Sequence, residues 1–266
     1  MESTRTDTLT FVGTATTLLR IGSFTVLTDP NFLHRGQRAY LGKGLWSRRL
    51  TEPALQPDEL PRLDAVVLSH LHGDHFDRIA RRHLDRTPPV ITTPAAARKL
   101  DSWGFDARGL DTWQRSELRV GDEVLSVEAL PGIHARGFMG ALLPPVMGSL
   151  LEHSVNGSVR QRVYVSGDTL TGDHLDEIAR RHPEIDTAVV HLGGTKVLLH
   201  TVTMDAEQGV DFLRRVDPRR AVPVHHDDYP VFRSPLSRFL SLAASEGWGD
   251  RVQTVERGET VSIAPF

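Results

Sequence analysis

Three histidines and one aspartate stand within six positions of this chain, at His70, His72, Asp74 and His75. Imidazole nitrogens and carboxylate oxygens are ligands that zinc, manganese and iron accept in proteins. A single histidine on a loop is usually solvated surface, whereas imidazoles packed together without a cation repel one another and are costly to desolvate. The cluster therefore indicates a metal site.

A short apolar stretch precedes this cluster, and a helical pattern follows it. Residues 65–68 predict a buried strand, because the stretch is apolar, rich in valine and only a few residues long. Residues 69–75 predict the turn that leaves the strand, where Gly73 permits a tight backbone. We therefore expect the cluster at the carboxyl end of a strand, ahead of a helix that starts near Phe76.

More ligand-type side chains follow predicted strands further along the chain. They are His134 after residues 123–130, Asp168 after 163–165, His191 after 186–190 and His225 after 221–224. Because groups at the carboxyl ends of strands collect along one edge of an α/β sheet, we expect these side chains to meet. His191 is interpreted as a core histidine, a hydrogen-bond partner of a ligand or a proton donor to a leaving group. His226 and Asp228 are expected either beside this site or on the surface.

Strands and helices alternate from residue 65 onward, which argues for βα units and an α/β fold. Three short strands are expected before that point, at residues 9–12, 16–21 and 24–27. Helices are expected at residues 94–103, 175–181, 205–216 and 234–244. We found no repeat, linker or low-complexity segment, so the prediction is one domain across residues 1–266.

The composition is that of an ordinary globular chain of 266 residues, with 39% hydrophobic and 24% charged residues. A formal net charge of −3 gives no overall attraction to nucleic acid, and no nucleic-acid partner is expected. Because there is no cysteine, any metal must be held by nitrogen and oxygen. No apolar run approaches the ~20 residues of a membrane span and no signal-peptide core begins the chain, so a cytoplasmic protein is expected.

Two segments depart from the regular pattern. Residues 31–61 are long and polar, and they are interpreted either as a lid or as poorly ordered chain. Their basic residues are expected to be solvated or to contact an anionic substrate; they are Arg35, Arg38, Lys43, Arg48 and Arg49. Residues 135–151, rich in glycine and large apolar side chains, predict either a buried packing loop or an apolar wall over the metals that receives a hydrophobic part of the substrate.

The stretch His70-Leu71-His72-Gly73-Asp74-His75 resembles the H-x-H-x-D-H signature of the metallo-β-lactamase superfamily of binuclear metallohydrolases. Ser166-Gly167-Asp168-Thr169 resembles the S-G-D-T of the same superfamily, whose aspartate bridges two metals. The resemblance implies a four-layer αβ/βα sandwich. The ligand sets that it implies are His70, His72 and His134 for one metal, Asp74, His75 and His225 for the other, and Asp168 as the bridge.

The resemblance also implies a reaction. Two dications about 3.5–4 Å apart lower the pKa of a shared water toward neutrality. We therefore expect two divalent ions, zinc first and manganese or iron as alternatives, and a bridging hydroxide that attacks an ester, lactone or phosphodiester of a small molecule. Asp74 and His191 are the candidate catalytic residues.

Within the superfamily, the sequence resembles the branch of ascorbate-6-phosphate lactonase and the N-acyl-phosphatidylethanolamine phospholipase. Thr28-Asp29-Pro30 supports it, since the aspartate of this motif lies near the metals in that branch; the alternative for Asp29 is an ordinary turn residue before proline. Thr14 departs from the branch, which often carries histidine or asparagine at that position.

Three other functions compete with this one. A nuclease on the same scaffold predicts a contiguous basic surface and an RNA-gripping arm, which the charge pattern does not favour. A flavin-partnered di-iron oxidoreductase usually has glutamate where His72 stands and carries a flavin domain. A non-catalytic metal-binding module tends to lose ligands, whereas this set is complete. The sequence leaves the substrate, the metal and the oligomeric state open.

Overall fold

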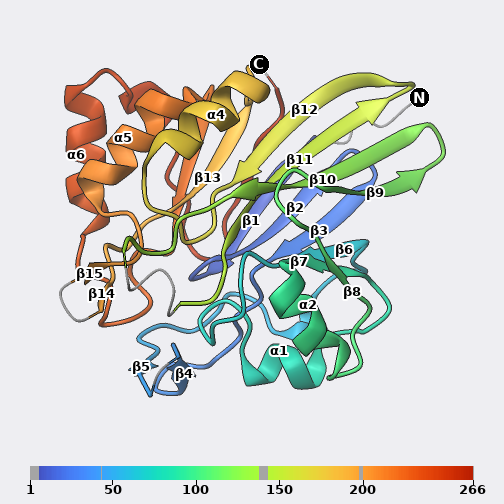
Figure 1. Cartoon of the computed structure of the whole chain (residues 1–266), viewed down its shortest axis with the longest axis horizontal. Helices are drawn as coiled ribbons and strands as arrows, with labels where there is room; N and C mark the ends of the chain where they lie inside the picture. Colours follow the sequence, from blue (N-terminus) through green and yellow to red (C-terminus); the bar gives the residue numbers. More distant parts are fainter. Residues whose placement is uncertain (1–5, 43, 138–142, 198–199, 266) are drawn as a thin grey trace.

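The computed structural model describes residues 6–42, 44–137, 143–197 and 200–265. Two β-sheets lie face to face, and helices cover their outer faces (Figure 1). One sheet contains Thr8–Gly13 (β1), Thr16–Ile21 (β2), Phe24–Thr28 (β3), Ala65–Val67 (β6), Val90–Thr92 (β7), Ala107–Gly109 (β8) and Thr260–Ser262 (β17), in the order β17-β1-β2-β3-β6-β7-β8. This arrangement confirms the predicted four-layer sandwich.

The second sheet carries most of the remaining strands. It contains Arg115–Val120 (β9), Glu123–Pro131 (β10), Met147–Val155 (β11), Ser158–Val165 (β12), Thr187–His191 (β13) and Arg220–Val224 (β16), in the order β16-β13-β12-β11-β10-β9. The helices are Arg78–His83 (α1), Pro94–Asp101 (α2), Asp173–Arg181 (α4), Ala206–Val216 (α5) and Leu236–Ser245 (α6), with short 3-10 turns at Pro57–Glu59 (η1) and Gly249–Arg251 (η2). Two small hairpins pair Arg38–Tyr40 (β4) with Trp46–Arg48 (β5), and Lys196–Val197 (β14) with His200–Thr201 (β15).

Apolar side chains between the two sheets form the central core. Strand alternation turns Leu9, Leu19 and Val127 inward, and each is fully buried. Burying one such side chain contributes about 1.5–3 kcal/mol. The outer layers add their own cores, with α4, α5 and α6 against the six-stranded sheet and α1 and α2 against β6 and β7. No helix among the described residues has the length and apolarity needed to cross a membrane.

Strand directions bring the polar residues that follow the strands to one edge of the sandwich. Strands β12, β13 and β16 run parallel to one another, and β3 runs parallel to β6 in the other sheet. Strand β10 points the same way as β12, because both are antiparallel to the β11 that separates them. The expectation that these strand exits share an edge is therefore met.

The structure corrects the interpretation of residues 135–151. Met147–Leu151 are not a loop, because they form the first half of β11, and Leu150 and Leu151 are buried in the cores on the two sides of the sheet. Consecutive apolar residues are what a strand with two covered faces requires. These side chains therefore cannot receive a substrate; residues 138–142 lie outside the described residues. Strand β9 was not foreseen, because its sequence is polar and largely exposed.

Residues 31–61 are ordered by a buried arginine. Strands β4 and β5 form a hairpin in this segment, and the side chain of Arg49, which follows it, is fully buried. Its guanidinium donates to the backbone oxygen of Asn31 (3.0 Å) and lies 3.4 Å from the carboxylate of Asp228. The expectation that Arg49 is solvated or contacts an anionic substrate was therefore wrong, because its side chain is buried against Asp228. Arg35, Arg38 and Arg48 are exposed, and Lys43 lies outside the described residues.

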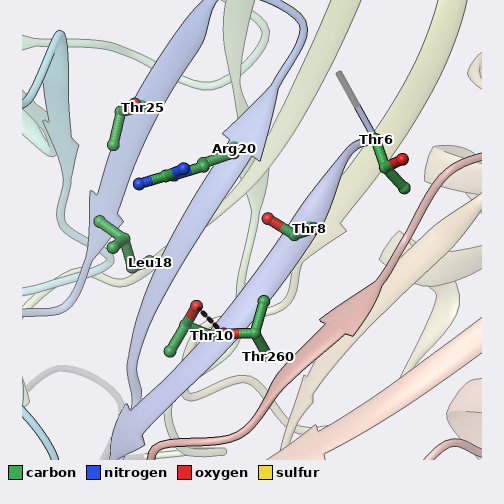
Figure 2. A pocket seen from close by; sticks show the side chains of 7 residues that line it. All are labelled: Thr6, Thr8, Thr10, Leu18, Arg20, Thr25 and Thr260. Carbon is green, nitrogen blue, oxygen red and sulfur yellow. Dashed lines mark hydrogen bonds between the residues drawn. The ribbon is translucent and has the colours of Figure 1, made fainter. Parts of the chain in front are cut away.

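A pocket of about 600 Å³ lies on the part of the seven-stranded sheet formed by β1, β2, β3 and β17 (Figure 2). Its lining consists of Thr6, Thr8, Thr10, Leu18, Arg20, Thr25 and Thr260, and the hydroxyls of Thr10 and Thr260 are hydrogen-bonded to each other. It contains no histidine and no carboxylate, so it offers no metal ligands.

We expect Asp228→Asn to destabilise the metal-free protein by about 3–5 kcal/mol at pH 7, because it leaves the buried Arg49 guanidinium without its counter-charge. Although burial favours the neutral acid, Arg49 and then Arg257 lower the pKa of Asp228 from 3.8 to about 2. A lowered folded-state pKa stabilises the fold above about pH 4, and this contribution disappears as the pH falls from 4 to 2. The difference between wild type and variant should shrink over that range in urea unfolding experiments.

Asp227→Asn is the matched control, because Asp227 is half exposed and its ion pair with Arg257 is worth about 1 kcal/mol or less. Equal stability losses in the two variants would contradict the assignment of the buried pair.

Candidate metal centre

The loop after β6 is fixed by contacts with residues 29–40. The carboxylate of Asp29 accepts hydrogen bonds from the backbone N–H of Ser69 (2.7 Å) and from its hydroxyl (3.0 Å). The side-chain amide of Asn31 donates to the carbonyl of Gly73 (2.8 Å). A Cβ at Gly73 would lie 2.7 Å from the backbone of Tyr40, so only glycine fits this approach. The loop is therefore held from both ends before any ligand binds.

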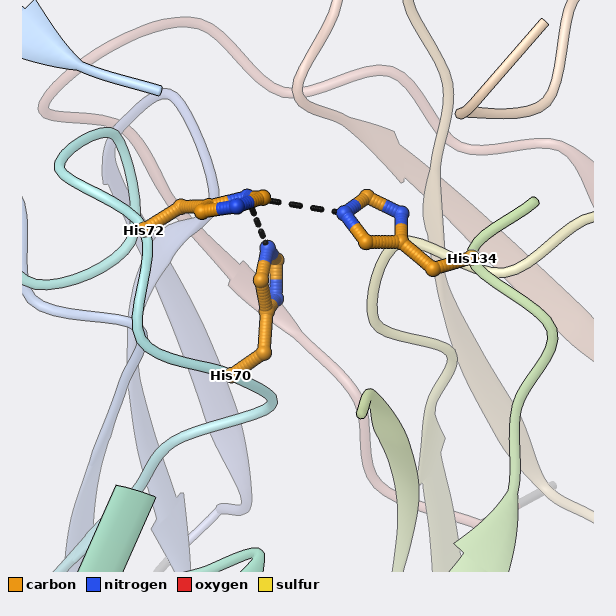
Figure 3. Close-up of side chains that lie close together, drawn as sticks. All are labelled: His70, His72 and His134. Carbon is orange, nitrogen blue, oxygen red and sulfur yellow. Dashed lines mark hydrogen bonds between the residues drawn. The ribbon is translucent and has the colours of Figure 1, made fainter. Parts of the chain in front are cut away.

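His70, His72 and His134 form the first ligand group, and Figure 3 shows their rings turned toward one another. Nδ1 of His72 lies 2.9 Å from Nε2 of His70 and 3.4 Å from Nε2 of His134. Nδ1 of His134 lies 3.0 Å from the carbonyl oxygen of Val202, which fixes the N–H on that side. The lone pair of Nε2 therefore faces the other two rings, as metal-ligating histidines require.

Asp74, His75, Asp168 and His225 form the second group, with one ligand atom from each within 4.8 Å of the others. Nε2 of His225 lies 3.5 Å from Asp74, and Nε2 of His75 lies 3.1 Å from Asp168. Among the described residues, Oδ1 of Asp74, Oδ1 of Asp168 and Nε2 of His225 are buried without a hydrogen-bond partner. Buried polar atoms are normally satisfied, so these lone pairs fit the donor set of a divalent cation.

Asp168 lies between the two groups. Its Oδ2 is 3.1 Å from Nε2 of His75 in the second group and 3.9 Å from Nε2 of His70 in the first. A carboxylate in this position can contact a cation in either group, which is the geometry that a bridging ligand needs.

The two groups differ in charge. Burial lowers the pKa of His70 well below its usual value, and the neighbouring imidazoles lower it further. Burial also lowers the pKa of His134, and it lowers that of His72 to about 4. In the second group burial opposes the charged ring, but Asp168 and the other carboxylates raise the pKa values of His75 and His225. The first group is thus neutral, and the second is a network of paired charges.

Asp29 connects His75 to His191 behind the second group. One of its carboxylate oxygens lies 3.2 Å from Nδ1 of His75 and 3.3 Å from Nε2 of His191. The other nitrogen of His191 lies 3.2 Å from the hydroxyl of Ser166, and the ring is fully buried. A carboxylate on the far nitrogen of a ligand histidine sets its orientation and increases its basicity. Nδ1 of His191 therefore faces the Ser166 hydroxyl, and its Nε2 faces the carboxylate of Asp29.

Strained backbone marks the same region. Asp29, His225 and Thr14 have φ values of 39°, 61° and 55°, in the left-handed region that non-glycine residues rarely adopt. The carbonyl of Thr14 accepts the backbone N–H of His225 at 2.7 Å. Such strain persists where surrounding structure enforces it, and it concentrates at functional sites.

The sequence analysis did not identify Ser69 and Ser166 as hydrogen-bond partners of the histidines, and it left the places of His226 and Asp228 open. Ser69 and Ser166 each follow a buried strand directly, a position that could have signalled their contacts with the histidines. Asp228 is fully buried, pairs with Arg49 and Arg257, and belongs to neither ligand group. The side chain of His226 is largely buried; its ring lies 6.3 Å from that of Phe11, and its Nδ1 lies 3.5 Å from Asp227.

A family model described as a beta-lactamase superfamily domain matches residues 25–226. The chain belongs to this superfamily. Homologues in it include a metal-dependent hydrolase of Staphylococcus haemolyticus, 28% identical over 76% of this chain and 82% of that protein. An uncharacterized protein of Mycobacterium tuberculosis is 27% identical over 90% of this chain. An N-acyl-phosphatidylethanolamine-hydrolyzing phospholipase D of Caenorhabditis elegans is 25% identical over 84%. The chain spans 64% of the length of each of these last two proteins.

Two solved structures share the fold along nearly the whole chain. A possible metal-dependent hydrolase from Veillonella parvula has a TM-score of 0.81, and an isothiocyanate hydrolase from Delia radicum gut bacteria has one of 0.80. Each is 20% identical and covers 97% of this chain, with 99% of the other chain covered. The metallo-β-lactamase fold expected from the sequence is therefore confirmed.

We expect Asp29→Asn to lower metal affinity or activity by about 10–100-fold, because asparagine cannot supply the negative charge beside His75. Asparagine tolerates a positive φ, so the backbone should be kept. Competition with a chelator measures the affinity, and circular dichroism checks the fold. The control is Asp58→Asn, since Asp58 is an exposed residue of η1. An Asp29→Asn protein with wild-type metal affinity and activity would contradict the orienting role.

Metal binding should release protons near neutral pH, because His75 and His225 have raised pKa values and must lose a proton to expose a lone pair. The apparent affinity should therefore rise with pH. Titration calorimetry in buffers of different ionisation enthalpy measures the release directly. A His83→Gln control, at an exposed position of α1, should behave as wild type. A binding enthalpy that is the same in every buffer would be evidence against the charge network described above.

Proposed function

We propose that this chain is a binuclear metal-dependent hydrolase that acts on an ester, lactone or phosphodiester of a small molecule. The observation that carries the proposal is the meeting of two ligand groups around Asp168, at distances of 3.1 and 3.9 Å from one histidine of each group. Oxygen and nitrogen donors in this number suit zinc, with manganese and iron as alternatives.

Each group has a separate task in this proposal. His70, His72 and His134 would hold one cation as neutral imidazoles, and Asp74, His75 and His225 would hold the other, with Asp168 shared. When bound, the two cations would lower the pKa of a shared water toward neutrality and stabilise the oxyanion that develops. The carboxylate of Asp74 would bind the second cation through one oxygen, and we assign its other oxygen to orienting the attacking water.

His191 is assigned to positioning rather than proton donation. Its ring has no exposed surface, and its two nitrogens face Asp29 and Ser166. A proton donor to a leaving group needs hydrogen-bond reach to that group. We infer that His191 holds Asp29, which in turn orients His75.

The names of two similar proteins suggest further compounds for the substrate screen. The C. elegans relative is named for hydrolysis of N-acyl-phosphatidylethanolamine, and the solved structure from gut bacteria is named an isothiocyanate hydrolase. Both compounds present an electrophilic centre to water. Aryl esters, lactones, aryl phosphodiesters and an aryl isothiocyanate therefore form the first panel, each assayed with zinc, manganese and iron.

We expect His72→Ala and Asp168→Ala each to lower turnover by at least about 100-fold, more than is usual for supporting residues, because each removes a ligand atom. Elemental analysis should show less metal bound per chain in both variants. His83→Ala, at an exposed position of α1, is the control and should keep both metal and activity. Undiminished metal content and turnover in both ligand variants would refute the proposal.

A further inference from the structure

A pocket of about 420 Å³ lies between the β4–β5 hairpin, helices α1 and α2, and the loop of residues 69–75 after β6, called the ligand loop below. Its size is within the range that encloses a small organic ligand. Aromatic side chains form much of its wall; they are Tyr40, Trp46, Phe76 and Trp103. In Figure 1 the hairpin is set apart from the sheets, at the side of the molecule that carries α1.

The pocket shares a wall with the first ligand group. That wall is the ring of His72, whose Nδ1 faces His70 at 2.9 Å. On the hairpin side, a Cβ placed on Gly42 would lie 3.4 Å from Nε2 of the same ring. A molecule in the pocket would therefore be one imidazole ring away from the proposed metal centre.

Two aromatic pairs line the pocket from opposite elements. The rings of Tyr40 and Trp46 on the hairpin lie 4.9 Å apart, and these side chains are 44% and 56% exposed. The rings of Phe76 and Trp103 are stacked 6.3 Å apart on the helical side. Large aromatic side chains held at the surface and facing a cavity indicate a binding site for an apolar or aromatic body.

The charged side chains of the lining are almost all positive. They are Arg38, Arg78, Arg81 and Lys99, and none of them forms an ion pair with a carboxylate in the described part of the chain. The guanidinium of Arg81 lies 4.1 Å over the ring of Trp103. Asp77 is the single carboxylate of the lining, and both of its oxygens already accept hydrogen bonds from backbone N–H groups: Oδ2 from Leu33 and Oδ1 from Ala80, among others. Among the described residues, the positive charge of these arginine and lysine side chains is therefore not neutralised by a carboxylate, and it is available to an anion.

We propose that this pocket binds an aromatic anion. The aromatic body would pack between the two ring pairs, and its carboxylate, sulfonate or phosphate group would take hydrogen bonds from the arginines. That the bound anion is part of the substrate rests on the proposed function. In that case the scissile group is attached to the aromatic anion and passes the ring of His72 to reach the metal centre.

The test measures binding of 8-anilinonaphthalene-1-sulfonate to the metal-loaded protein by fluorescence. Arg78→Gln/Arg81→Gln should weaken binding by about 10-fold, since hydrogen bonds to a charged group are lost. Arg82→Gln/Arg98→Gln is the matched control, because it removes two exposed charges outside the lining, one from α1 and one from α2. The neutral analogue N-phenyl-1-naphthylamine should bind more weakly than the sulfonate and should not respond to either double variant.

A second pair of variants tests the aromatic wall. Trp46→Ala should weaken binding of the sulfonate, whereas Leu50→Ala, which truncates another exposed apolar side chain outside the lining, should not. Repeating the titration on metal-free protein separates the pocket from the metals, because pocket binding should persist. Equal affinities in all four variants, or binding that requires metal, would overturn the inference even if the protein is an active hydrolase. Binding as expected without any hydrolysis would leave the pocket in place and count against the proposed function alone.

Discussion

The contacts of His75 with a carboxylate on each side constrain the whole site. Its ring is fully buried, with Nδ1 3.2 Å from Asp29 and Nε2 3.1 Å from Asp168. Charges can occupy such a buried space only when opposite charges and hydrogen bonds offset their desolvation. Asp29 also receives the N–H and hydroxyl of Ser69, so the same carboxylate that orients the ring holds the start of the ligand loop.

The sandwich closes around this network at one edge. Thr14 belongs to the turn between β1 and β2 of one sheet, and its carbonyl accepts the N–H of His225, which follows β16 of the other. Both residues have left-handed backbone, as does Asp29. Two sheets with a common core can enforce conformations that a short segment would not adopt alone. At Thr14, Asp29 and His225 the strained backbone therefore lies where the two sheets hold the ligands in place.

Residues 31–61 serve the site in two ways at once. The buried Arg49 ties the segment to Asn31 and Asp228, and Asn31 in turn supports the ligand loop at Gly73. The same anchoring presents the β4–β5 hairpin to the helices α1 and α2, where its aromatic side chains line a pocket beside His72. A segment without regular periodicity thus supports both the ligand loop and the cavity next to it.

The sequence by itself determined which strands surround the site and which polar residues directly follow each strand. Short apolar stretches and the turns after them are local patterns, and a sequence records local patterns directly. It also carried the H-x-H-x-D-H motif of His70 to His75, and with it the fold. Only the tertiary structure decided that Asp29 faces His75 and His191, that Arg49 is buried against Asp228, and that residues 147–151 are a strand. Such pairings join residues far apart in the chain, and their energy depends on burial and on opposite charge, neither of which a local pattern records.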